Sequence, residues 1–122
     1  MNKLNPIESE CCKIPKGWGH ELILVNNEKY CGKILFFKKG CKFSMHYHMI
    51  KQETWYVQEG YLLFSWIDTE VGQTLTKMIG KGDVVTIPVG LPHQLCAQSD
   101  AEIIEISTQH FDYDSFRIHK GD

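Results

Sequence analysis

The chain has 122 residues, 43% of them hydrophobic and 23% charged, and a formal net charge of −2 at pH 7. This length allows one domain with one modest core. The composition lacks the clustered positive charge that nucleic-acid binding demands, and no apolar run approaches the length of a membrane span. The N-terminus also lacks the apolar segment of a signal peptide, so we expect a cytoplasmic protein without nucleic-acid or membrane partners.

The predicted elements are strands. Residues 1–19 are mixed and contain two prolines, which favours an N-terminal arm over a helix. Short segments rich in branched and aromatic residues then alternate with turns marked by glycine or asparagine. They predict strands at residues 20–26, 30–37, 42–48, 53–58, 61–67, 73–79, 84–88, 93–98 and 102–107. Such spacing is typical of an all-β barrel or sandwich.

The sequence therefore predicts one domain over residues 1–122. An arm at 1–19 precedes a barrel at 20–107, and a polar tail follows at 108–122. We expect the tail to pack along the outside, with at most a short helical turn. A barrel of this size can cover its edges by pairing with a copy of itself, so we expect a homodimer. The apolar first strands and the arm are the candidate contact face.

Three histidines and one glutamate have the spacing of a metal site. His46 and His48 are two residues apart, so on a strand they share one face. A short turn at 49–52 then brings Glu53 onto the next strand beside them. His93 starts a later strand after a rigid turn that contains two prolines. Neutral imidazoles with one carboxylate suit one divalent transition ion, such as Zn, Fe, Mn, Ni or Co.

The alternative is a polar cluster buried for packing or hydrogen bonding. Burying an unpaired carboxylate and three imidazoles in a small core costs several kcal/mol for each group unless they are paired. A bound cation removes that cost. The sequence therefore favours metal binding by His46, His48, Glu53 and His93.

These residues lie in two blocks that resemble the paired motifs of the cupin superfamily. The matching positions are Gly40, His46, His48, Glu53 and Gly60 in the first block, and Gly82, Pro88, Gly90 and His93 in the second. Ala97 stands where the second motif ends in asparagine. The resemblance implies a double-stranded β-helix (jelly-roll, cupin) barrel that holds one ion on the three histidines and the glutamate.

Two further resemblances concern carbohydrates. Residues 16–21, 53–57 and 105–108, with Phe116-Arg117, are similar to the cupin domain of type II mannose-6-phosphate isomerases. That family has proline where Gly17 stands and often a basic residue where Gln94 stands. The spacing of His46, His48, Lys51 and Glu53 is similar to that of the D-lyxose isomerase cupins. Both resemblances imply an aldose–ketose isomerase that acts on a sugar or sugar phosphate through a metal-stabilised ene-diolate.

Two other functions stay open. Three histidines and a carboxylate also suit an Fe(II)-dependent dioxygenase, and the same barrel can serve as a non-catalytic sugar- or metabolite-binding module. In each case the partner is a small molecule, and carbohydrate is the class that the resemblance implies.

Candidate catalytic and substrate-binding residues lie near the motif. Lys51 is most simply a solvated loop lysine, but its ammonium group could polarise a substrate oxygen, or act as a base if its pKa were lowered. Glu53 could act as the base only by leaving the metal. Trp55 has the inward parity of Glu53, so it either fills the core or forms an apolar wall for a sugar ring. Ala97 has the inward parity of His93 and would leave room above the ion.

The other polar residues and the cysteines say less about function. Arg117 is the only arginine and falls in the tail, so an unphosphorylated sugar is compatible with the sequence. The cysteines are odd in number, without a C-x-x-C pair, which favours reduced thiols. Cys96 should point away from the ion by strand parity. Three histidines have no partner spacing and are expected at the surface or an interface: His20, His110 and His119.

Overall fold

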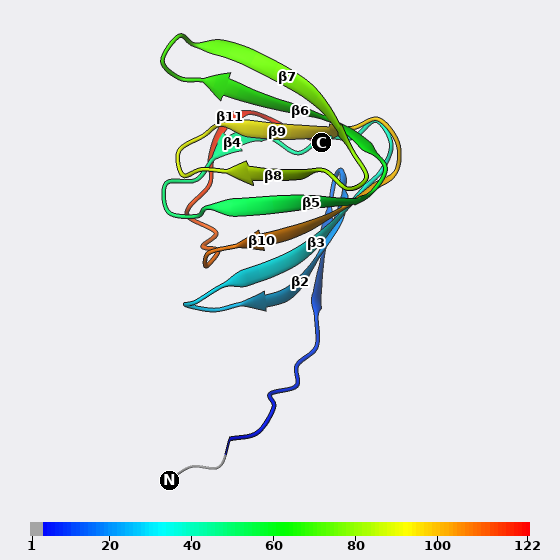
Figure 1. The fold of residues 1–122 in the computed structure, drawn as a ribbon, viewed down its shortest axis with the longest axis vertical. Coiled ribbons are helices and arrows are strands. Elements are labelled where there is room, and N and C mark those ends of the chain that lie inside the picture. Colours follow the sequence, from blue (N-terminus) through cyan, green and yellow to red (C-terminus); the bar gives the residue numbers. More distant parts are fainter. Residues whose placement is uncertain (1–3) are drawn as a thin grey trace.

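The computed structural model describes residues 4–122, which form strands and connecting turns (Figure 1). The strands are β1 (Cys12–Lys16), β2 (Gly19–Asn26), β3 (Cys31–Phe37), β4 (Met45–Tyr47), β5 (Glu53–Glu59), β6 (Tyr61–Asp68), β7 (Gln73–Gly80), β8 (Val84–Ile87), β9 (His93–Ala97), β10 (Ala101–Ser107) and β11 (Phe116–His119). Within this part of the chain there is no helix, and therefore none that could cross a membrane.

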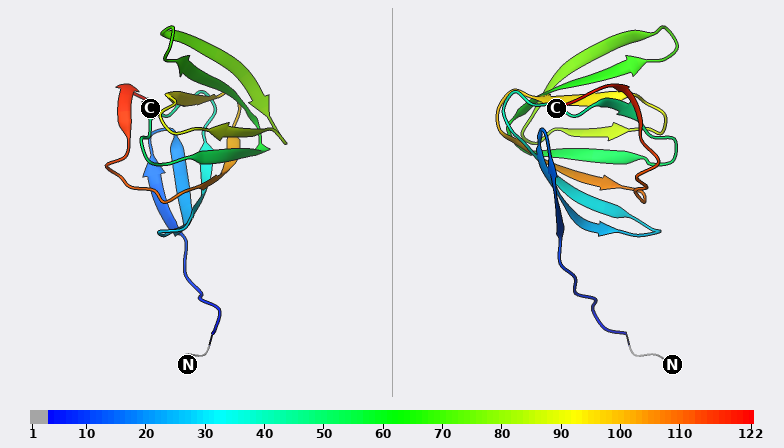
Figure 2. Two further views of the ribbon diagram at one scale, coloured as in Figure 1. Left: turned by 60° about the vertical axis from the view of Figure 1, so that its left-hand side comes forward. Right: turned by 180° about the vertical axis from the view of Figure 1, so that it is seen from behind.

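All strand pairs are antiparallel and belong to two sheets. The six-stranded sheet has the order β1-β2-β3-β10-β5-β8, and the five-stranded sheet has the order β11-β4-β9-β6-β7. The chain changes sheet repeatedly, for example between β3 and β4 and again between β4 and β5. The two sheets face each other, and the β6–β7 hairpin forms the outer end of the five-stranded sheet (Figures 1 and 2). This confirms the predicted all-β class.

The core lies between the sheets because inward and outward residues alternate along the central strands. In β3 every second residue is buried, and β9 and β10 follow the same rule. Trp55, Val57, Leu62, Leu95 and Ile103 are fully buried at its centre. Aromatic side chains close one end of this core, where Trp18 stacks on Phe37 at 4.6 Å between ring centroids.

The structure contains two strands that the sequence analysis did not predict. β1 lies in the predicted arm and pairs with β2. β11 lies in the predicted tail and pairs with β4. Both are edge strands, and most of their residues are exposed on both faces. A strand without a buried face needs no apolar alternation, so the sequence has no period-2 signal there.

One expectation about the site is corrected. The sequence analysis placed Glu53 on a strand beside the two histidines. The structure has β4 in the five-stranded sheet and β5 in the six-stranded sheet. The turn at 49–52 therefore carries the chain across the interior, and Glu53 faces His48 and His93 from the opposite sheet.

Candidate metal centre

Three histidines converge in the interior. His46 on β4 is directly opposite His93 on β9 in the strand register, and their ring centroids are 4.5 Å apart. His48 follows the end of β4, with its ring 4.9 Å from that of His46. One nitrogen from each ring lies within 4.8 Å of the corresponding nitrogens of the other two. These residues could hold a metal ion, as the sequence predicted.

Backbone carbonyls fix the orientation of all three rings. Nδ1 of His46 lies 2.7 Å from the carbonyl of Ser44, and Nδ1 of His93 lies 2.8 Å from that of Leu91. Nδ1 of His48 contacts the carbonyl of Asp114. Since a carbonyl only accepts, each Nδ1 must donate, and each neutral ring then has its lone pair on Nε2. This is the ring orientation that metal-binding histidines commonly have.

Glu53 lies against this group from the opposite sheet. Its Oε2 is 3.5 Å from Nε2 of His48, and its Oε1 is 3.6 Å from Nε2 of His93. The indole N–H of Trp55 donates to Oε1 of Glu53 at 2.8 Å and holds the carboxylate in place. The predicted fourth ligand is thus within reach of two of the three histidines.

The site fits a cation and is unfavourable without one. Lone pairs on Nε2 of His48 and His93 face carboxylate oxygens, which also only accept. Nε2 of His93 is buried and lacks a hydrogen-bond partner within residues 4–122, and Oε2 of Glu53 has the Lys51 ammonium group 3.2 Å away. A buried acceptor without a donor costs about 1–3 kcal/mol. Two ligand atoms about 2.1 Å from one tetrahedral ion lie about 3.4 Å apart, close to the observed separations.

The C-terminal segment shapes the loop between His48 and Glu53. The Asp114 carboxylate accepts hydrogen bonds from the backbone N–H groups of Met49, Ile50 and Lys51 at 2.7–3.2 Å. These bonds lower the pKa of Asp114, although desolvation opposes them. The tail therefore holds both the His48 ring and the turn after it, and does not merely cover the outside.

Burial keeps the imidazoles neutral. Desolvation, with the neighbouring His93, lowers the pKa of His46 to about 3. Desolvation also lowers the pKa of His93 to about 4, although the Leu91 carbonyl opposes it. A metal ligand must present an unprotonated nitrogen, so both rings are prepared for a cation at neutral pH.

Lys51 is buried, not solvated as the simpler interpretation of the sequence had it. It is 4% exposed, and its Nζ lies 3.2 Å from Glu53 Oε2 and 3.3 Å from Glu105 Oε2. Nζ also donates to Nδ1 of His110 at 3.3 Å. Desolvation alone would lower the pKa of Lys51, but Glu105 and Glu53 outweigh it and raise the pKa. Lys51 is therefore an ammonium group here, not a base.

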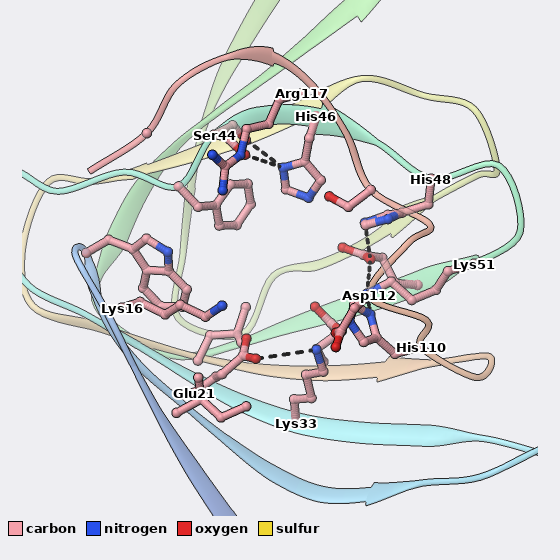
Figure 3. A pocket seen from close by; sticks show the side chains of 18 of the residues that line it. Lys16, Glu21, Lys33, Ser44, His46, His48, Lys51, His110, Asp112 and Arg117 are labelled. Atoms are coloured by element: carbon pink, nitrogen blue, oxygen red, sulfur yellow. Dashed lines mark hydrogen bonds and ion pairs between the residues drawn. The ribbon is translucent and has the colours of Figure 1, made fainter.

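The candidate site opens into a cavity of about 630 Å³ (Figure 3). His46 and His48 lie on one side, and Glu21 and Lys33 lie on the other (Figure 3). Most of the other lining side chains are polar or charged: Lys16, Ser44, Lys51, Glu53, Glu105, His110, Asp112, Ser115, Arg117, Lys120 and Asp122. The arrangement suits a small polar molecule with several hydroxyl groups or charges.

Trp55 and Ala97 are not at the surface of this cavity. Both have the inward parity that the sequence predicted, but both are 0% exposed. Trp55 packs edge-on against Phe43 and Phe64, which fill the space where a sugar ring would stack. Its observed contact with the site is the hydrogen bond to Glu53.

Several lining residues were missed from the sequence. Glu105 was noted only within a resemblance, His110 was expected at the surface or an interface, and Arg117 was set aside as part of the tail. Each comes from a segment far from the motif, so its spacing carried no signal. Desolvation lowers the pKa of His110, with a contribution from nearby lysines.

Comparisons with known proteins agree with this architecture. The family model described as Cupin matches residues 14–116. No curated protein matches the chain. CapF, a capsular polysaccharide assembling protein from Staphylococcus aureus, is 18% identical over 92% of this chain with a TM-score of 0.79. Oxalate decarboxylase from Bacillus subtilis, in its structure at pH 4.6, is 21% identical over 94% with a TM-score of 0.75.

The chain spans about a third of these solved proteins, 35% of CapF and 33% of the decarboxylase. Likeness at this identity establishes the fold alone. The protein is thus an all-β protein with two facing sheets and a candidate three-histidine metal centre between them. With the family model matching most of its length, the chain belongs to the cupin family.

Removal of one histidine should empty the site. In His48→Ala we expect bound metal to fall to background and the melting temperature of the metal-loaded protein to drop to that of the chelated wild type. Elemental analysis and thermal unfolding measure the two effects. His119→Ala removes an exposed histidine and should leave both unchanged. Full metal content in His48→Ala would disprove its role as a ligand.

The metal-free protein should lose stability in mild acid. An unfolded chain has histidine pKa values of about 6.5, against about 3 for His46 and about 4 for His93 when folded. Between pH 4 and 6.5 the unfolded state binds more protons, so stability rises with pH there, by up to about 1.4 kcal/mol per pH unit for each ring.

Urea unfolding of chelated protein at several pH values tests this dependence. Stability should be greatest above about pH 6.5 and fall as the pH is lowered. The variant His93→Gln should show a shallower dependence between pH 5 and 6.5, where carboxylates contribute less. Equal slopes for the two proteins would contradict the expectation.

Proposed function

We propose that this protein is a metal-dependent aldose–ketose isomerase that acts on a sugar or sugar phosphate. The observation that carries the proposal is the convergence of His46, His48 and the buried His93 beside a polar cavity, which His46 and His48 line together with the Lys51–Glu105 pair. An isomerase of this kind needs a cation for the carbonyl and a proton-transfer group beside it.

The metal centre comprises His46, His48, His93 and Glu53 as ligands of one divalent ion, among Zn, Fe, Mn, Ni and Co. The bound ion would supply Lewis-acid polarisation of the carbonyl and the adjacent hydroxyl oxygen. Trp55 keeps the Glu53 carboxylate oriented through its 2.8 Å hydrogen bond. Within the cupin barrel that the two sheets form, the polar cavity gives a substrate access to the centre.

Lys51 and Glu105 take the other roles. The Lys51 ammonium donates a hydrogen bond to the substrate oxygen on which negative charge develops. Since its pKa is raised, the proton between the two carbons is moved by a carboxylate, and Glu105 is the one beside Lys51 that is not a proposed ligand. Glu53 can do so only by leaving the ion.

Two other functions predict different behaviour. An Fe(II) dioxygenase would consume oxygen and lose activity under nitrogen, whereas an isomerase would be indifferent to air. A non-catalytic binding module would bind sugar with no turnover, whichever metal is supplied. The buried Lys51–Glu105 pair beside the centre favours the isomerase, because simple binding does not need a proton-transfer group.

Deuterium incorporation tests the reaction. Purified without chelator and incubated with aldoses and aldose phosphates in D₂O, the protein should introduce deuterium at C2, which NMR detects. Glu105→Gln should lower kcat by about 10²–10⁴-fold while metal content stays at the wild-type level. Glu59→Gln, on the exposed end of β5, should be fully active. Absence of incorporation with every sugar and metal would refute the isomerase.

We also propose that the protein is a cytoplasmic homodimer. An apolar row crosses the outer face of the six-stranded sheet, with Leu22, Ile34, Ile104, Tyr56 and Val84 as register partners. Val84 is 64% exposed, and apolar surface of this kind favours contact with another chain.

Sedimentation equilibrium tests the dimer. The wild type should have twice the mass of one chain. Ile106→Glu, next to the row on β10 and 60% exposed, should reduce it to one chain. Met78→Glu makes a similar change on exposed β7 and should remain dimeric. A wild type that sediments as a single chain would exclude this assembly.

A further inference from the structure

Exposed residues on and beside the outermost strands of the two sheets line one part of the cavity, which we call its mouth. β1 is the first strand of the six-stranded sheet, and β11 is the first strand of the five-stranded sheet. Lys16 lies on β1 and Arg117 on β11, and both line the cavity, as does Lys120 just after β11. Figure 3 shows Arg117 and Lys16 extending into it from opposite sides.

The acidic side chains of the cavity are already engaged. Their contacts are Glu21 with Lys33, Glu53 and Glu105 with Lys51, Asp112 with His110, and Asp122 with the backbone N–H of Lys42. In contrast, Lys16, Arg117 and Lys120 form no ion pair within residues 4–122. The mouth therefore carries three cationic groups that are not held in ion pairs with the described part of the chain, and the carboxylates of Asp122 line the cavity beside them.

Arg117 is also aligned with the metal centre. It is the register partner of His46, which in turn is the partner of His93. Register partners on antiparallel strands project from the same face, with Cβ atoms about 4.5–5.5 Å apart. The Arg117 side chain therefore projects from the strand next to that of His46, a proposed metal ligand. A small molecule that reaches the centre with one end can reach Arg117 with another group.

We propose that Arg117 and Lys16, with Lys120 at the rim, form an anion-binding subsite for the phosphate or carboxylate of the substrate. The proposal rests on the proposed function for the end of the substrate at the metal, and it narrows the substrate to an anionic sugar. A guanidinium group binds the oxygens of such an anion through two parallel hydrogen bonds, and the ammonium group adds a point charge. The proposed subsite replaces the expectation from the sequence that Arg117 lies in the tail, away from the site.

The lone arginine provides a direct probe. Since Arg117 is the only arginine, its Nε–Hε group gives a single assigned signal in a ¹⁵N correlation spectrum. Titration of metal-free protein with inorganic phosphate, and separately with acetate, should shift that signal saturably. Stronger binding of phosphate would indicate a sugar phosphate, and stronger binding of acetate a sugar acid.

Variants separate the subsite from general charge attraction. Lys16→Gln should weaken binding of the preferred anion about tenfold, and Arg117→Gln at least as much, read from the backbone amides of residues 14–18 and 116–120. Arg117→Lys should restore part of the affinity. Lys77→Gln removes the same charge from exposed β7 and should bind as the wild type does.

Two results would overturn the subsite: no saturable shift with either anion, or equal affinity in the wild type, Lys16→Gln and Arg117→Gln. The titration uses neither metal nor sugar, so its failure differs from failure of the isomerase. Anion binding without deuterium incorporation would retain the subsite and reject the reaction. Deuterium incorporation without anion binding would support the isomerase and reject the subsite.

Discussion

His46, His48 and His93 each donate the Nδ1 hydrogen to a backbone carbonyl, and this turns three Nε2 lone pairs toward one region of the interior. Glu53 adds a carboxylate from the facing sheet, so acceptors meet acceptors where little water can intervene. The Lys51 ammonium group offsets the charge of Glu53, but Nε2 of His93 has no hydrogen-bond partner within residues 4–122, and a cation among these atoms would supply one. The contact of Asp114 with the His48 loop and the orientation of Trp55 both serve to maintain this arrangement.

The facing sheet contributes charge as well as a ligand. Lys33 and Glu105 are register partners on β3 and β10, and Lys51 lies between Glu105 and Glu53. Opposite charges thus alternate across the buried floor of the cavity. Each of these carboxylates lies beside an ammonium group, so no isolated charge is buried. A polar cavity in so small a core is stable only because these groups are paired.

Most of the strands could be predicted from sequence, because their apolar residues alternate with the period of a sheet that is buried on one face. β1 and β11 could not, since both are exposed edge strands with no such pattern. The site, too, could be predicted only where its residues are close together in the sequence. His46 and His48 are linked by local spacing, whereas Glu105, His110 and Arg117 reach it from distant segments. Lys51 was misjudged as solvated because its carboxylate partners lie across strands.

The sequence by itself determined the all-β class, the cupin resemblance and the histidines of the candidate metal centre, because strand parity and the two motif blocks are local properties of the chain. Only the tertiary structure decided which sheet presents Glu53 and which charges surround Lys51. It also decided that Arg117 and Lys16, 101 positions apart in the chain, line the same cavity. These are contacts between segments far apart in sequence, and burial and strand register set them.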